Sequence, residues 1–409
     1  MSSCAPRSKA PALFAVGAAA VMLAVIMGVL INGLTAFFVP MELAEGWARA
    51  DVAGINSSGL IGLAAGSVFM GYVADRLSIR AICLLAASSM GICLILASQA
   101  TSLWMPYVLF FIAGALGGGT LFAPIFAYVG NWFPQSTGVA IGVAAAGQAV
   151  GQGSVPLLAA HLIEAFGWRN AMLALGCGTL VILLPLAWGM RQAPAPAASS
   201  LREPQLRPAL AVPILSAAIF FCCTCMAVPL MHLMPLLQSL CISSTDAGGV
   251  MFAMLLAAIA GRVAYGKLCD LIGATRSWFV ASSLQTIGVL AFTLFGSLQG
   301  FLIFSIVYGF AYAGVMTSLL VATRALTPAR DKATWMGIVF SFAWLGHAFG
   351  GFQGAFAYDL TEGYEAGFAA GALAGASNLI LVGTLIWLTR SPAPAVQPVG
   401  QHLQAARGS

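Results

Sequence analysis

Charged side chains are scarce in this 409-residue chain, where Asp, Glu, Lys and Arg together make up only 7% of the residues. Soluble globular proteins carry roughly 25% charged residues, so this chain has too few to cover a water-facing surface. The scarcity excludes a cytosolic enzyme, a nucleic-acid-binding protein and a disordered scaffold. Hydrophobic residues instead account for 60%, and the mean hydropathy is +0.96. The composition therefore predicts an all-α protein that crosses the lipid bilayer many times.

Motifs for catalysis and for ATP-driven transport are also missing. The chain has no H-E-x-x-H zinc motif, no G-x-S-x-G nucleophile elbow and no glycine-rich phosphate loop followed by Lys and Ser or Thr. It also lacks the repeated filter sequences or charged rings of a channel. The nine cysteines lie mostly in apolar runs, where a thiol behaves as a small hydrophobic group. We therefore expect neither an enzyme, nor a cofactor, nor a metal site.

Twelve apolar segments divide the chain. Crossing the ~30 Å hydrocarbon layer takes about 20 residues of helix. Segments of this kind occupy approximately 12–39, 53–74, 81–99, 104–130, 138–160, 171–190, 209–237, 248–269, 278–296, 299–323, 335–357 and 367–389. A Pro-rich polar stretch separates the sixth from the seventh segment. The predicted organisation is a first six-helix bundle (1–190), a linker (191–208), a second six-helix bundle (209–390) and a tail (391–409).

The loop charges predict the orientation. Lys and Arg concentrate in both termini and in the loops that follow even-numbered helices, whereas the opposite loops hold only Arg49 and Arg169. Basic residues collect on the cytoplasmic side of membrane proteins. We therefore expect both termini and the linker to be cytoplasmic, in a multi-pass protein of the inner (plasma) membrane.

The two halves repeat each other. Gly71 to Asp75 matches Gly266 to Asp270 at an offset of 195 residues, and Gly167-Trp168-Arg169 matches Gly363-Tyr364-Glu365 at an offset of 196. Both pairs lie at equivalent helix–loop junctions. Parallel repeats of six helices place a substrate site between the halves, near the middle of the membrane.

The loop between the second and third helices reads G-x-x-x-D-R-x-x-x-R, from Gly71 to Arg80, and a weaker copy begins at Gly266. This pattern resembles the loop signature of the major facilitator superfamily. The resemblance covers nearly the whole chain and implies that family's rocker-switch fold of two pseudo-symmetric bundles. It implies a gating role in which an Asp–Arg pair holds the outward-open state. The residues at those positions are Asp75, Arg76, Arg80 and the counterpart Asp270. The alternative is that these charges only anchor helix ends.

Finer motifs resemble one branch of the superfamily. Asn131-Trp132-Phe133-Pro134 and Gly261-Arg262-Val263 are similar to motifs of bacterial monocarboxylate-transporter-like and oxalate/formate-antiporter-like proteins. The G-x-x-x-G-P signature of drug exporters is broken, because Gln148 follows Gly147. The branch keeps its substrate-binding arginine at the position of Arg262.

Arg262 is the leading candidate for substrate binding. An ionisable group inside a membrane helix usually faces a cavity or a partner. A guanidinium offers a planar fork of donors that suits a carboxylate. The alternative is that the side chain extends to the membrane surface, because Lys267 marks the end of its helix five residues on. The resemblance favours the substrate role. Ala258 stands where eukaryotic relatives carry an acidic residue, and Asn32 where they carry a lysine. Oxalate exchangers also carry a second cation in the eleventh helix, where this chain offers only His347. One fixed cation fits one carboxylate, so a monoanion is favoured over a dianion.

Further candidates lie on other helices. Asn32, Gln148 and Gln152 are polar groups in apolar helices, which line a cavity or join neighbouring helices. The resemblance implies substrate-facing aromatic residues at Phe122, Tyr308 and Tyr312. Trp344 is a candidate for the aromatic wall opposite. His232 and His347 are candidates for proton coupling or for structural hydrogen bonds, because the ordinary pKa of an imidazole lies near neutral pH.

These residues together predict a secondary transporter of small organic anions. The expected partners are a small monocarboxylate, a proton or counter-anion, and the lipid bilayer, with no nucleic acid; we expect the monomer to function alone. Alternating access between the bundles would drive either proton symport or anion exchange. Two alternatives remain: an exporter of amphipathic organic compounds in which Arg262 is structural, and a transporter-like sensor that binds its ligand without moving it.

Overall fold

The computed structural model describes residues 10–47, 49–193, 206–328 and 331–389 of the chain. Within these ranges the protein consists of helices and turns, and no strand occurs. The predicted all-α membrane fold is confirmed. Eleven of the described helices are long and apolar enough to cross a membrane. Their bounds follow the apolar segments closely, because a chain in lipid must satisfy its backbone hydrogen bonds within each crossing helix.

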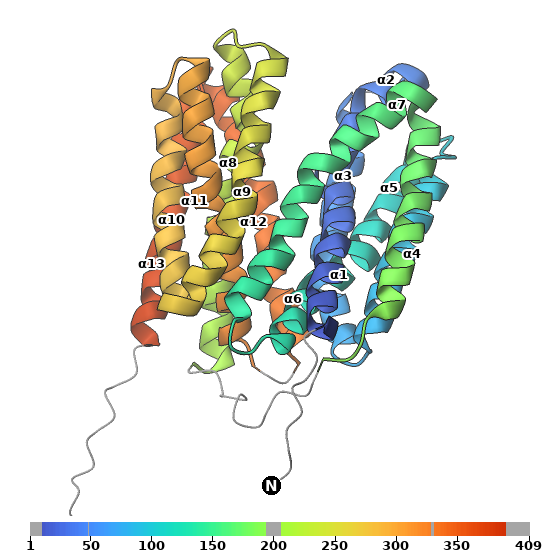
Figure 1. The fold of residues 1–409 in the computed structure, drawn as a ribbon. Coiled ribbons are helices and arrows are strands. Elements are labelled where there is room, and N and C mark those ends of the chain that lie inside the picture. Colours follow the sequence, from blue (N-terminus) through green and yellow to red (C-terminus); the bar gives the residue numbers. More distant parts are fainter. Residues whose placement is uncertain (1–9, 48, 194–205, 329–330, 390–409) are drawn as a thin grey trace, which may run out of the picture.

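The helices form two bundles (Figure 1). The first contains α1 (Ala10–Met27), α2 (Phe38–Glu45), α3 (Arg49–Ala74), α4 (Ile79–Ala97), α5 (Trp104–Ile112), α6 (Thr120–Trp132) and α7 (Thr137–Gly189). The second contains α8 (Pro208–Ser239), α9 (Ser244–Ile272), α10 (Ala274–Ala291), α11 (Leu298–Leu326), α12 (Lys332–Thr361) and α13 (Glu365–Leu388). Most of the linker, 194–205, and the tail after 389 lie outside the described residues.

Helix α7 makes two crossings. Its 53 residues bend at Gly167, whose φ of 75° and ψ of 164° suit a residue without a Cβ. The predicted segments 138–160 and 171–190 are therefore two crossing helices that meet at Gly167, within the predicted break between them. Beside the bend, Arg169 forms an ion pair with Glu45 (2.8 Å) and donates to the carbonyl oxygens of Ser98 and Ala100. The Gly-Trp-Arg motif thus joins the loops at this end of the first bundle.

The first crossing helix is interrupted, unlike the single helix expected over 12–39. A π-helical turn, η1 (Gly28–Asn32), and a 3₁₀ turn, η2 (Gly33–Phe37), follow α1. At Gly28 the backbone approaches α7 so closely that a Cβ there would lie 2.7 Å from the carbonyl oxygen of Gly151. Turns of this kind often accompany functional sites. A second π-helical stretch, η3 (Ala113–Gly119), joins α5 to α6, and a 3₁₀ turn, η5 (Phe292–Leu294), follows α10.

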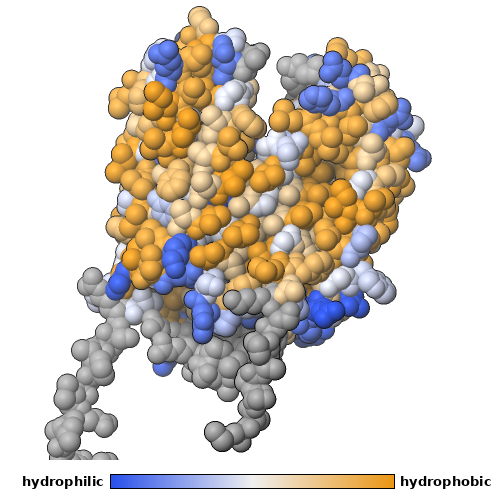
Figure 2. All heavy atoms as spheres, viewed as in Figure 1, coloured by the Kyte–Doolittle hydropathy of each residue, from blue (hydrophilic) through white to orange (hydrophobic). Residues whose placement is uncertain are grey.

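The bundles touch at one end and diverge at the other (Figure 1). At the touching end, which we call the closed end, α3 and α9 finish and α7 and α12 begin. Figure 2 shows a notch between the bundles at the opposite end, which we call the open end. Hydrophobic side chains cover the middle of both bundles, and hydrophilic ones gather toward their two ends (Figure 2). The molecule therefore adopts a state that opens toward one side.

Candidate functional site

Two aspartates connect the bundles at the closed end. Asp75, just beyond α3, accepts hydrogen bonds of 2.9 and 2.8 Å from the backbone N–H groups of the second and third residues of α12. Asp270, in the last turn of α9, accepts bonds of 2.8 and 3.1 Å from the second and third residues of α7. Each carboxylate therefore caps a helix of the opposite bundle and interacts favourably with the positive end of its dipole.

These two contacts make the internal repeat visible in three dimensions. The same offset of 195 residues separates Asp75 from Asp270 and the capped residue Gly138 from its counterpart Ala333. Glycines allow the helices to meet: a Cβ on Gly71 would lie 2.7 Å from the carbonyl oxygen of Ala333, and one on Gly266 would collide with the backbone of Gly138. The two halves thus close the same end with equivalent helix pairs, α3 with α12 and α9 with α7.

The arginines of the same loop do not pair with Asp75, which differs from the Asp–Arg pair that the resemblance implied. Arg76 lies over the ring of Tyr72, 4.0 Å from its centre. Arg80 donates from Nε to the carbonyl oxygen of Met190 (3.4 Å). The reason is that the carboxylate of Asp75 already accepts three hydrogen bonds, two from the backbone of α12 and one from the hydroxyl of Thr334.

Removing either cap should loosen the closed end. Loss of a capping side chain costs about 0.5–2 kcal/mol, so Asp75→Ala or Asp270→Ala should raise the population open at this end by about 2- to 30-fold. Cys269 reports this opening: it is 5% exposed and lies against the start of α7, where a Cβ on Gly138 would approach it to 3.0 Å. The measurement is the rate at which a maleimide alkylates Cys269 in a protein whose other eight cysteines are replaced.

The matched control is Asp246→Ala. Asp246 accepts a hydrogen bond from Ser243 at the start of α9, at the open end and within one bundle. Its removal should leave the alkylation rate of Cys269 unchanged. Equal rates in all four proteins would show that the two caps do not hold this end closed.

A third connection at the closed end joins Arg324 to Asn131. Nη2 of Arg324, near the end of α11, donates to Oδ1 of Asn131 at the end of α6 (2.5 Å). Nζ of Lys332 donates to the backbone carbonyl oxygen of Arg324 (3.1 Å). The sequence did not predict a site role for any of these residues. The available signal was the Asn-Trp-Phe-Pro motif, which begins at Asn131.

Arg262 lies deeper, between the two bundles. Its side chain on α9 is 2% exposed, and Nη1 donates to the backbone carbonyl oxygen of Ala145 (2.5 Å) and to Oε1 of Gln148 (3.1 Å). Both acceptors are on α7, in the opposite bundle. Nε is buried without a hydrogen-bond partner. The guanidinium therefore points across the interface between bundles, whereas extension to the membrane surface would require it to follow α9 toward Lys267.

The charge of Arg262 has no carboxylate partner among the described residues. Its contacts within the described part of the chain are a carbonyl, an amide oxygen and the phenol of Tyr312. A buried cation that has only neutral acceptors is costly, because these acceptors replace the lost hydration incompletely. The arrangement therefore leaves the guanidinium able to accept an anion.

The contact between Arg262 and Gln148 has no equivalent at the matching positions of the internal repeat. At the 195-residue offset, Arg262 corresponds to Ser67 and Gln148 corresponds to Ala343. Ser67 bonds back to its own helix, donating to the carbonyl oxygen of Leu63 (2.7 Å). The backbone contacts at these positions are nevertheless alike, because a Cβ on Gly142 would lie 2.5 Å from the carbonyl oxygen of Arg262 and a Cβ on Gly337 would collide with that of Ser67. The halves therefore share their packing here but differ in charge.

Two tyrosines extend from Arg262 into the second bundle. Tyr312 and Tyr308 are each 2% exposed, and their rings stack with centres 5.6 Å apart. Tyr308 also contacts Phe292, with ring centres 4.9 Å apart, and its hydroxyl is buried without a hydrogen-bond partner. The structure thus places Tyr312 beside the guanidinium and Tyr308 one layer behind it.

An aromatic cluster also joins the bundles. The ring of Phe122 on α6 contacts Phe126 on the same helix and both Phe340 and Trp344 on α12, with centres 5.2–5.4 Å apart. All four rings are buried. Two of the separately predicted aromatic candidates, Phe122 and Trp344, are therefore in direct contact across the interface.

The remaining candidates have other partners than Arg262 in the described part of the chain. Asn32 is half-buried in η1, and Gln152 is half-buried one turn beyond Gln148 on α7. His232 hydrogen-bonds through Nε2 to the carbonyl oxygen of Gly351 (2.9 Å), which joins α8 to α12 within the second bundle. The ring of His347 lies 6.3 Å from that of Trp344, beside the aromatic cluster.

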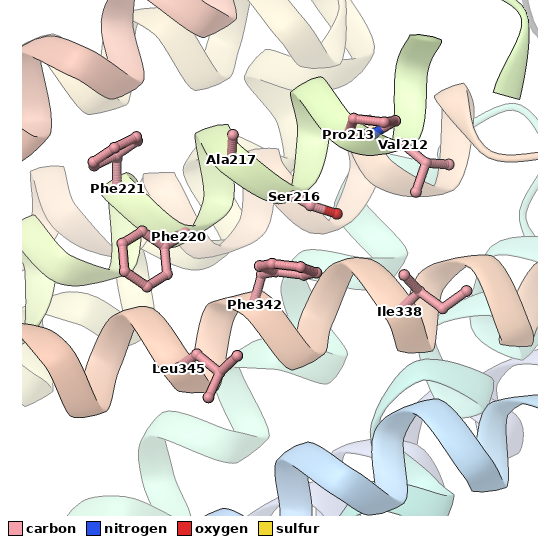
Figure 3. A pocket seen from close by; sticks show the side chains of 9 residues that line it. All are labelled: Val212, Pro213, Ser216, Ala217, Phe220, Phe221, Ile338, Phe342 and Leu345. Atoms are coloured by element: carbon pink, nitrogen blue, oxygen red, sulfur yellow. The ribbon is translucent and has the colours of Figure 1, made fainter. Parts of the chain in front are cut away.

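An apolar cavity of about 620 Å³ lies between α8 and α12 (Figure 3). Its lining side chains are shown as sticks: Val212, Pro213, Ser216, Ala217, Phe220, Phe221, Ile338, Phe342 and Leu345. The lining contains no charged group and none of the predicted site residues. Phe342 and Leu345 are exposed on the bundle surface. The cavity is therefore suited to an apolar group and not to a carboxylate.

Comparison with known proteins agrees with this architecture. The family model of the Major Facilitator Superfamily matches residues 21–239 and 213–408. The chain is 25% identical over 378 residues to monocarboxylate transporter 13 of Rattus norvegicus, covering 89% of this chain and 86% of that protein. It is 30% identical over 241 residues to the fujikurins efflux protein of Gibberella fujikuroi, covering 56% of this chain but only 50% of that relative.

A solved structure shows the same fold at low sequence identity. The proton:xylose symporter XylE superimposes with a TM-score of 0.74 at 14% identity, covering 93% of this chain and 96% of that one. Two six-helix halves, equivalent closing contacts and these matches lead to one conclusion. The chain belongs to the Major Facilitator Superfamily, in the branch that resembles the monocarboxylate transporters.

Proposed function

We propose that this transporter moves small monocarboxylates by alternating access, with Arg262 as the group that binds the carboxylate. The observation that carries the proposal is the buried guanidinium between the bundles, which has neutral acceptors only. The similarity to monocarboxylate transporter 13 supports the same substrate class. One fixed cation suits one carboxylate, so a monoanion is favoured over a dianion.

Binding would release a contact between the bundles. A carboxylate entering from the open end can take the donors that now bind Ala145 and Gln148, and its charge neutralises that of Arg262. The second bundle would then lose the hydrogen bonds that Arg262 donates to α7. The hydrogen bonds of Asp75 and Asp270 would remain to be broken, and each is of the strength of an ordinary helix cap. Substrate binding thus lowers the barrier to opening the closed end.

A different set of residues bears on the choice between proton symport and anion exchange. Ala258 lies one turn before Arg262, where relatives carry an acid, so we propose either anion exchange or proton symport through a histidine. His347 is the better placed of the two histidines, because it adjoins the aromatic cluster between the bundles. We further propose that the closed end is cytoplasmic, as the positive charge of the loops predicts, and that the monomer functions in the plasma membrane.

The test is the uptake of labelled pyruvate, lactate, formate and oxalate into proteoliposomes, with and without an inward proton gradient. Pyruvate and lactate should enter, and oxalate should be a poor substrate. Flux that requires preloaded internal anion indicates exchange, whereas flux that the proton gradient accelerates indicates symport. Ligand-induced stabilisation without flux of any anion would instead indicate a sensor.

A second candidate function rests on the apolar cavity between α8 and α12. Its uncharged lining suits a hydrophobic group, and the match to the fujikurins efflux protein points toward larger organic substrates. If this alternative holds, Phe220→Ala would impair export of an amphipathic dye, and Arg262→Lys would have little effect on it. Pyruvate would then neither enter the vesicles nor compete with the dye.

A further inference from the structure

Two cations at the closed end lack acidic partners among the described residues. Arg324 contacts the amide oxygen of Asn131, and Lys332 contacts the backbone carbonyl oxygen of Arg324 itself. Both side chains are partly buried. Nε of Arg324 is fully buried and has no hydrogen-bond partner. The ammonium of Lys332 therefore lies at the backbone of Arg324, and each cation is held by a neutral acceptor only.

Arg324 contacts residues of both bundles. Asn131 belongs to the first bundle, whereas Arg324 and Lys332 both belong to the second. The guanidinium lies against Gly130, where any Cβ would collide with it. When the closed end opens, Asn131 must withdraw while the two cations stay together. Opening therefore frees Nη2 of Arg324 beside the already unpaired Nε.

We propose that Arg324 and Lys332 form a second anion site, which binds the carboxylate of the transported compound once the closed end has opened. The inference rests on the proposed function. Nε and Nη2 form one edge of the guanidinium, the edge that binds a carboxylate through two parallel hydrogen bonds. The ammonium of Lys332 adds a second positive charge. The site thus receives the substrate on its way between Arg262 and the aqueous phase.

The position of α11 supports this path. The helix carries Tyr312, which contacts Arg262, and Arg324 twelve residues later. Twelve residues of helix extend about 18 Å, so one helix runs from the central site to the closed end. A carboxylate that leaves Arg262 would meet Arg324 and Lys332 at the end of this distance.

The experiment compares Lys332→Gln, Arg324→Gln and Asn131→Ala with the wild type in pyruvate exchange, with KM measured separately at each face of oriented proteoliposomes. Lys332→Gln and Arg324→Gln should each raise KM at the closed-end face about tenfold, because each removes a charged hydrogen-bonding group. The KM at the open-end face should not change. Asn131→Ala is the matched control, since it removes the same connection between bundles but keeps both cations.

A different pattern would overturn the site. If Asn131→Ala raises KM as much as Arg324→Gln, and Lys332→Gln has no effect, Arg324 only connects the bundles. If the effects appear only in vesicles that contain phosphatidylglycerol, the anion is a lipid headgroup.

A second readout does not need transport. Pyruvate should raise the melting temperature of solubilised Asn131→Ala protein, and adding Lys332→Gln should reduce that rise. An unchanged rise would contradict the site. If no protein transports pyruvate and yet this shift behaves as expected, the proposed function fails while the anion site stands.

Discussion

Replacing Arg262 with lysine should reduce pyruvate uptake roughly 100-fold in kcat/KM. Loss of one partner of a buried, hydrogen-bonded charge pair costs 2–5 kcal/mol, and each 1.4 kcal/mol corresponds to a factor of ten. Lysine keeps the positive charge but offers a point donor in place of the planar fork. It should also lose one of the two hydrogen bonds to Ala145 and Gln148, so the variant separates geometry from charge.

Initial rates of labelled pyruvate uptake provide the measurement, normalised to the amount of folded protein. Arg276→Lys is the matched control, because it makes the same chemical change at a residue that is exposed at the start of α10, away from the interface. The control should transport at the wild-type rate. Undiminished uptake in Arg262→Lys would remove the basis for the proposed substrate class.

Replacing Gln148 with glutamate should abolish pyruvate transport by giving Arg262 a permanent internal partner. The amide oxygen of Gln148 lies 3.1 Å from Nη1 of Arg262, so a carboxylate at this position would form an ion pair across the bundles. Such a pair competes with the substrate and strengthens the closed end. We expect a loss of at least about 100-fold in kcat/KM, together with slower alkylation of Cys269.

Two further variants test this reasoning. Gln148→Met is close in shape but removes the acceptor, so it should speed the alkylation of Cys269 instead of slowing it. Gln152→Glu places the same new charge one turn away on α7, where no contact with Arg262 occurs, and its effect on uptake should be much smaller. Equal losses from the two glutamates would mean that any negative charge on this helix is harmful, and that pairing with Arg262 is not the cause.

The sequence predicted the crossing helices because they depend on local composition. Spacing alone left Arg262 open between a buried position and extension to the membrane surface, and the family resemblance favoured the buried one. An arginine in an apolar helix stands out, and the repeat at 195 residues marks the closing loops. The interruption after Met27 was not predicted, because it depends on how closely the end of α1 approaches α7. Such approaches are decided by packing between segments distant in the sequence.

The partners of the charged residues could not be predicted for the same reason. Asp75 was expected to pair with an arginine in its own loop, but the nearest unsatisfied donors are the N–H groups of α12. Asn131 and Arg324 are separated by 193 residues and belong to different bundles. A pattern within one loop carries no information about such a neighbour. The internal repeat did indicate that Asp75 and Asp270 are equivalent, and Asp270 contacts the start of α7 as Asp75 contacts the start of α12.

The most direct test of the account is whether pyruvate itself opens the closed end. In the protein that retains Cys269 as its single cysteine, pyruvate should raise the alkylation rate of this thiol severalfold, with half-saturation near the KM for transport. The same concentration of pyruvate should have no effect in the Arg262→Lys variant. A rate that is independent of pyruvate, or one that rises equally in both proteins, would contradict the claim that a carboxylate releases Arg262 from Gln148 and Ala145.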